Sequence, residues 1–128
     1  MPNPATNTAS ATVTTTLAKL ATIEFGEWRT IACELRNSGA TALNACAVKL
    51  VPHPGSTVGF TLADSTADFA DATLIGCVGL DGATGDPTGL AAAGRVNLMI
   101  PRNGNYATEI WASVGSSTTT VEMKYGGR

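Results

Sequence analysis

The chain has 128 residues, a formal net charge of −2 and a sequence isoelectric point of about 5.2. Hydrophobic residues make up 44% of it, which is enough for one folded domain and excludes a disordered chain. The lysines and arginines are scattered singly and no apolar run reaches membrane length, so we expect neither nucleic acid nor a membrane as a partner.

Charged residues are scarce, at 14% of the chain, well below the roughly one quarter that is usual in soluble domains. One interpretation is that other copies or a larger assembly cover part of the surface. The alternative is a small sandwich whose own surface is neutral and rich in hydroxyl groups.

The first 16 residues are rich in Pro, Asn, Ala and Thr, and Val13 is their only sizeable apolar residue after Met1. Such a segment buries too little apolar surface to fold alone. We therefore predict an extended N-terminal arm over 1–16, either free or ordered by a neighbour, followed by a domain over 17–128.

Alternation of apolar and polar residues predicts the first strands of that domain. The segment 16–26 is expected to be a strand, and 28–37 is a stronger candidate because Ile31, Cys33 and Leu35 share one face. Asn37 to Thr41 predicts a turn, in which Gly39 supplies the positive φ that such a loop needs.

Six more strands are expected after that turn, in chain order. Segment 42–54 alternates until its prolines end it, 56–64 follows, and the apolar run 72–80 predicts a strand covered on both faces. The region Asp81 to Gly94 reads as a long glycine-rich loop. Segments 95–101, 105–114 and 117–126 complete the set, the last two forming a hairpin. About seven or eight short strands without a long helix predict an all-β fold, an antiparallel β-sandwich of immunoglobulin-like or jelly-roll type.

Two stretches carry a family resemblance. "WRTIACELRNSGATALNACAVKLVP" and "MIPRNGNYATEIWASVG" are similar to the strand and turn units of immunoglobulin-like modules of the CARDB type, over about Thr22 to Tyr125. Modules of this kind occur in tailed phages as head decoration (cement) proteins or tail appendages. The resemblance thus implies a virion protein made in the host cytoplasm. Its partner would be the major capsid protein or another virion protein, and it would form a homo-oligomer, with a trimer possible.

Residues that carry chemistry in other proteins are present here without the spacing that such chemistry needs. His53, the one histidine, lies between two prolines in an expected surface loop, with no nucleophile elbow nearby. Cys33, Cys46 and Cys77 are interpreted as small buried hydrophobic residues, although Cys33 and Cys46 could face each other on neighbouring strands. We expect no catalytic residue and no cofactor.

Two acidic clusters are candidate calcium sites. One comprises Asp64, Asp68 and Asp71, and the other comprises Asp81 and Asp86. Neither has the spacing of a calcium-binding loop, so we interpret them as turn-forming aspartates and expect no metal.

The leading hypothesis is a non-enzymatic structural protein that docks many times on a repetitive lattice. The alternative is an adhesin or carbohydrate-binding module, for which Trp28, Trp111, Tyr106 and Tyr125 are the available aromatic side chains. The candidate partner-binding residues lie in the arm and in the long loop: Pro2, Pro4, Thr6, Thr8, Val13, Asp81, Asp86, Pro87 and Leu90.

Overall fold

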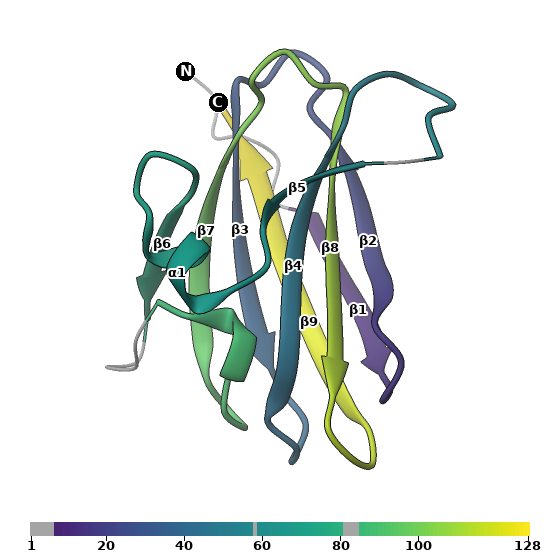
Figure 1. Ribbon diagram of the computed structural model, residues 1–128, viewed down its shortest axis with the longest axis vertical. Coiled ribbons are helices and arrows are strands. Elements are labelled where there is room, and N and C mark those ends of the chain that lie inside the picture. The colour runs from purple at the N-terminus through teal and green to yellow at the C-terminus, as the bar shows by residue number, and fades with distance from the viewer. Residues whose placement is uncertain (1–6, 58, 81–84) are drawn as a thin grey trace.

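The computed structural model describes residues 7–57, 59–80 and 85–128. These residues form nine strands in two antiparallel sheets that pack face to face (Figure 1). Sheet A has the order β1 (Asn7–Val13), β9 (Thr119–Gly127), β3 (Thr30–Asn37), β7 (Arg95–Pro101), β6 (Gly76–Gly79). Sheet B has the order β2 (Ala18–Glu24), β8 (Ala107–Val114), β4 (Leu43–Val51), β5 (Phe60–Ala63). The predicted all-β antiparallel sandwich is confirmed.

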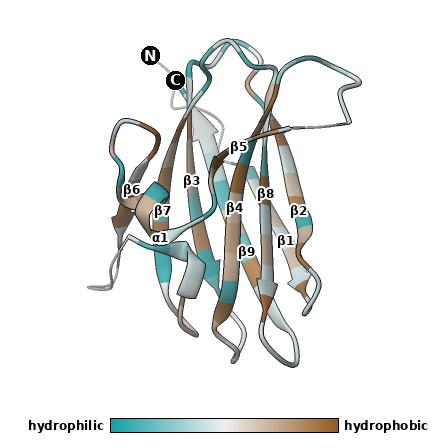
Figure 2. Ribbon diagram, viewed as in Figure 1, coloured by the Kyte–Doolittle hydropathy of each residue, from teal (hydrophilic) through white to brown (hydrophobic). Residues whose placement is uncertain are grey.

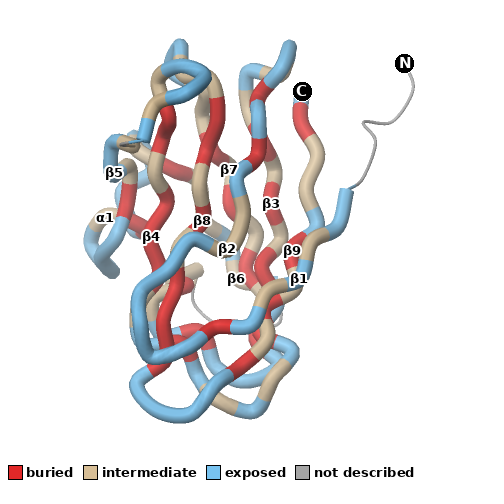
Figure 3. Tube along the Cα trace, turned by 90° about the vertical axis from the view of Figure 1, so that its right-hand side faces the viewer, coloured by how far each residue is buried: buried red, intermediate tan, exposed pale blue. Residues whose placement is uncertain are grey.

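The core lies between the sheets and is built by alternating residues. On β3, Ile31, Cys33 and Leu35 are buried, as predicted, while the residues between them face solvent. Hydrophobic and hydrophilic stretches alternate along the strands (Figure 2), and buried positions alternate with more exposed ones (Figure 3). Burial of one face of each strand provides most of the driving force for this packing.

Strands adjacent in sequence often cross between the sheets instead of pairing. β8 and β9, predicted as a hairpin, lie in different sheets: β8 pairs with β2 and β4, whereas β9 pairs with β1 and β3. The hairpin prediction is therefore wrong. The turn at Ser117, with φ 61°, leads from one sheet to the other, and turn residues alone do not distinguish such a crossing from a hairpin.

The segment expected to be an arm contributes a strand to the sandwich. Asn7–Val13 forms β1, which pairs with β9 in a register running from Asn7↔Tyr125 to Val13↔Thr119. Val13 is buried in the core, and Ala9 and Ala11 pack against it. β1 raises the strand count above the predicted seven or eight, because its small side chains give only a weak alternation signal. Residues 1–6 of the expected arm lie outside the described residues.

Two further local predictions are wrong. The apolar run 72–80 was expected to be covered on both faces, but β6 is an edge strand of sheet A and Val78 is 58% exposed. Gly39 has no positive φ. It is needed for close packing, because a Cβ at this position would collide with the Thr119 hydroxyl and the Thr120 backbone nitrogen.

A short helix lies on the connection from β5 of sheet B to β6 of sheet A, and a 3-10 turn lies on the connection from β6 to β7 within sheet A. Helix α1 (Thr66–Ala70) places Phe69 in the core, and η1 (Pro87–Gly89) lies against β4. Ser65 caps α1 by accepting from the Asp68 N–H, and Asp86 caps η1 in the same way through Thr88.

Candidate functional site

The outer face of sheet A carries a pattern of opposite charges on its three central strands. Two of the strands each carry two opposite charges, two residues apart: Glu122 and Lys124 on β9, and Glu34 and Arg36 on β3. The third strand, β7, carries Arg95. Because side chains two residues apart on a strand share a face, all five side chains lie on one surface.

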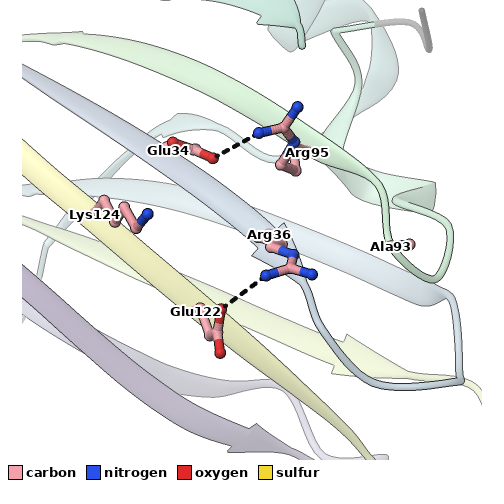
Figure 4. A pocket seen from close by; sticks show the side chains of 6 residues that line it. All are labelled: Glu34, Arg36, Ala93, Arg95, Glu122 and Lys124. Atoms are coloured by element: carbon pink, nitrogen blue, oxygen red, sulfur yellow. Dashed lines mark ion pairs between the residues drawn. The ribbon is translucent and has the colours of Figure 1, made fainter. Parts of the chain in front are cut away.

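The strand register brings these charges into ion pairs. Arg36 lies opposite Glu122, and their side chains approach to 3.5 Å between Nη1 and Oε2. Arg95 on β7 lies opposite Arg36, and Glu34 is two residues before Arg36 on β3. The Oε1 of Glu34 is 3.7 Å from the Arg95 Nη1. Figure 4 shows both pairs and the neighbouring Lys124.

These ion pairs add little to the stability of the fold. The side chains of Arg36 and Glu122 are 52% and 46% exposed, so water screens their attraction. Exposed pairs of this kind contribute roughly 0.2–1 kcal/mol. Their charges are therefore accessible to a partner, and exchanging an internal ion pair for an intermolecular one costs little.

The charged surface is hollowed and continues into a less polar region. One hollow of about 330 Å³ is lined by Glu34, Arg36, Ala93, Arg95, Glu122 and Lys124 (Figure 4). A neighbouring hollow of about 450 Å³ shares Glu34 and Lys124 with the first and extends over Ala32, Met99 and Gly126. The small residues Ala32 and Gly126 are opposite each other in the register, so no large side chain rises above the sheet at these two positions. Both hollows lie on the outer face of sheet A, which is the side of the sheet that points away from the core.

The outer face of sheet B has a different character. Trp111 lies on it with Lys49 above its ring, the amino nitrogen 4.2 Å from the ring centroid. The indole N–H of Trp111 donates to Glu109 at 3.2 Å, and Lys19 pairs with the same carboxylate at 3.5 Å. Lys49 thus occupies one face of the ring that a sugar would need.

The other aromatic candidates are also engaged within the chain. Trp28 packs directly against the backbone of Gly127, where a Cβ would overlap its ring. Tyr106 interacts with Glu24, and a side-chain hydrogen bond between them raises the pKa of the Tyr106 hydroxyl. Tyr125 on β9 packs against the core, and Trp111 lies on β8 of the other sheet, so the four aromatic side chains do not form one platform.

Two of the three cysteines occupy the interior, as predicted, while Cys77 lies half-buried on the edge strand β6. Cys33 and Cys46 are buried free thiols that come from opposite sheets, β3 and β4, rather than from paired strands. Burial raises the pKa of Cys33 to about 12 and also raises that of Cys46. Cys77 is half-buried, and desolvation raises its pKa to about 11. A raised pKa suppresses the thiolate that nucleophilic chemistry needs.

The aspartates act as turn and cap residues where they are described. Asp71 accepts from the N–H and the hydroxyl of Thr73, and these bonds hold its pKa below the usual value. Burial acts to raise the pKa of Asp86, but hydrogen bonds from Thr88 and Thr66 outweigh it and the pKa is lowered. Among the described residues, no group of three or more His, Cys, Asp or Glu side chains could hold a metal ion. Asp81 lies outside the described residues.

The sequence-predicted partner-binding residues are dispersed, and several are covered by the chain itself. Val13, Pro87 and Leu90 are buried, so they stabilise the fold and are not available to a partner. Thr8 is exposed on β1, and Asp86 caps η1 beside a hollow of about 290 Å³. Pro2, Pro4 and Thr6 lie outside the described residues.

Sequence reasoning missed the charged surface on the outer face of sheet A, although the sequence holds a pattern that points to it. Glu34 with Arg36 and Glu122 with Lys124 are opposite charges at a spacing of two on predicted strands. Only the register, which places Arg36 beside Glu122, shows that the two strands are neighbours.

The fold and this surface define the chain as an all-β antiparallel sandwich with a charged outer sheet face. No known protein family matches it, and no curated protein is similar to it. A solved structure of the SPBc2 prophage-derived protein YomS is similar over 98% of this chain and 99% of that one, with 11% identity and a TM-score of 0.48. The resemblance to CARDB-type immunoglobulin-like modules is not confirmed and stays a prediction. No helix in the described part of the chain is long and apolar enough to cross a membrane.

Proposed function

We propose that this chain is a non-enzymatic structural protein of a phage virion, a capsid decoration protein that docks on a repetitive lattice through the outer face of sheet A. The observation that carries the proposal is the set of five charges of both signs, all at least partly exposed, that three neighbouring strands hold in one hollowed surface. A surface of this kind selects a partner of complementary charge.

The mechanism is repeated weak docking. Each copy offers a modest charged surface, and exposed ion pairs contribute little singly. When many copies sit on a lattice, or when linked copies bind neighbouring sites, the weak contacts add up to firm attachment.

Charge reversal tests the docking face against a matched control. Lys124→Glu turns the outer face of sheet A acidic, whereas Lys19→Glu reverses another exposed lysine, on sheet B. Purified variants are mixed with particles that lack the protein and then sedimented. We expect Lys19→Glu to co-sediment like wild type and Lys124→Glu to be lost from the particles, with wild-type binding weakened by salt. Equal co-sedimentation of both variants would overturn the proposed face.

A carbohydrate-binding module is the alternative. The observation that favours it is the indole ring of Trp111, which lies on the outer face of sheet B with Lys49 over one side of the ring. A glycan array separates the two functions. Reproducible sugar binding that disappears in Trp111→Ala would replace lattice docking by sugar recognition.

A further inference from the structure

β1 differs from the other edge strands of the described structure. The edges of the two sheets are β1 and β6 in sheet A and β2 and β5 in sheet B. β5 and β6 have four residues each, while β2 carries Lys19 and Glu24 and has a register shift. β1 has seven residues, no charge, no proline and no register shift. Short length, charges and irregularities are the usual means by which edges avoid pairing, and β1 has none of them.

The hydrogen-bonding direction of β1 follows from its neighbours. The N–H of Ser38 donates to the Thr120 carbonyl at 2.9 Å, so the backbone groups of Thr120 point toward β3. Since these groups alternate sides along a strand, those of Val121 and Met123 point toward β1. Their register partners on β1 are Ala11 and Ala9. The odd-numbered residues of β1 therefore bond to β9.

The even-numbered residues Thr8, Ser10 and Thr12 consequently turn their backbone N–H and C=O groups away from β9, toward the open edge. All three residues are exposed, and Figure 3 shows β1 as mostly exposed or intermediate. The edge ends at Thr14, whose carbonyl accepts from the N–H of Val114 on β8.

The sequence of this edge is a palindrome. Residues 8–12 read Thr-Ala-Ser-Ala-Thr. Antiparallel pairing of two such strands centred on Ser10 places serine opposite serine and Thr8 opposite Thr12, on the outer face. Alanine lies opposite alanine on the inner face, where Ala9 and Ala11 already pack against the core. Cross-strand hydroxyl pairs and matched small side chains are favourable in sheets.

We propose that two copies of this chain pair through β1, antiparallel and centred on Ser10, so that the two A sheets become one continuous sheet. Ser10 exchanges both of its backbone hydrogen bonds with Ser10 of the second copy, and Thr8 exchanges both of its bonds with Thr12. The interface is isologous, as a twofold axis requires. The occupant is a second copy because the palindrome is complementary to itself.

The dimer has a consequence for docking. Directly opposed residues in a sheet point to the same side, so the twofold axis through Ser10 places the outer faces of both A sheets on one side. Two charged surfaces then face the same partner, which gives bivalent attachment. The pairing itself does not depend on the proposed virion function, and its test measures self-association alone.

A cysteine placed at the twofold axis tests the register. In a background with Cys77→Ser, Ser10→Cys puts two Cα atoms roughly 5.5 Å apart, within disulfide range. Thr8→Cys is the matched control, because in this register the two Thr8 positions are four residues apart along the strands, roughly 14 Å. Under mild oxidation of the full chain, we expect a linked dimer from Ser10→Cys and none from Thr8→Cys. Equal linkage, or none from either, would overturn the register.

A second pair of variants tests the hydrogen bonds without relying on cross-linking. Ser10→Pro removes an N–H that the monomer does not use, while Ser10→Ala keeps it. In sedimentation velocity over a wide concentration series, we expect wild type and Ser10→Ala to dimerise alike. Ser10→Pro should raise the dissociation constant at least about tenfold, with unchanged circular dichroism. A wild-type chain that stays monomeric throughout, or a Ser10→Pro chain that dimerises like wild type, would refute the pairing.

Discussion

Asn37 is a buried polar residue that links three parts of the fold, and replacing it with alanine should clearly lower the stability of the protein. Its side chain is fully buried at the end of β3. Its amide nitrogen donates to the carbonyls of Thr41 at 2.8 Å and Leu90 at 3.0 Å. Its oxygen accepts from the Thr119 hydroxyl at 2.7 Å and the Gly39 N–H at 3.3 Å. One amide thus joins the 37–41 turn, the end of η1 and the start of β9.

The cost of Asn37→Ala follows from these four bonds. A typical hydrogen bond contributes about 1 kcal/mol net, and a buried group left without its partner costs about 1–3 kcal/mol. Two of the four bonds are fully buried. We expect the free energy of unfolding to fall by about 3 kcal/mol, which corresponds to a drop in Tm of roughly 10 °C for a domain of this size.

Urea denaturation followed by tryptophan fluorescence measures this change. Asn44→Ala is the matched control, because Asn44 is exposed on β4, and we expect it to change stability by less than about 0.5 kcal/mol. The reasoning is refuted if Asn37→Ala is as stable as Asn44→Ala.

The other predictions concern packing, titration and surface charge. Gly39→Ala should destabilise the fold by about 1–3 kcal/mol in thermal unfolding, because the new Cβ meets the Thr119 hydroxyl and a rigid backbone; a wild-type Tm would contradict this. Cys33 and Cys46 have raised pKa values in the folded state, so their stabilisation is complete below pH 9, the usual value of a cysteine, and is lost as pH rises from there toward 12. The slope of stability against pH in that window should reach about 1.4 kcal/mol per pH unit for each thiol and should decrease when both are changed to alanine; an unchanged slope would show that other groups titrate. Arg36→Glu should leave the free energy of unfolding within about 1 kcal/mol of wild type in urea titrations, since the ion pair of Arg36 is half exposed. A larger loss would show that the ion pairs of this face stabilise the fold.

Alternation of residue types predicted the strands because one buried face per strand imposes a period of two. The prediction works best where large apolar residues mark the buried face, as with Ile31, Cys33 and Leu35 on β3. It fails on β1, because Ala9 and Ala11 bury too little area to stand out from their neighbours. The register with β9, which is a tertiary contact, is what makes this segment a strand.

Pairing between strands could not be predicted from local sequence. The turns after β3 and β8 contain ordinary turn residues, yet both connect the two sheets. A short apolar run also does not show whether its strand lies in the centre or at the edge of a sheet. For this reason β6 was wrongly predicted to be covered on both faces. The candidate docking face depends on the pairing of Arg36 with Glu122, so it became visible only with the register.

Mass spectrometry of purified virus particles is the most direct test of the central claim, that this chain is a structural part of a phage virion. Particles of the phage proposed to carry this chain are purified on a density gradient, and the peptides of the chain are quantified against those of the major capsid protein. A fixed ratio that persists through repeated purification is expected if each lattice site holds its copy. Peptides found only in the lysate, or a ratio that falls toward zero with each purification step, would contradict the account.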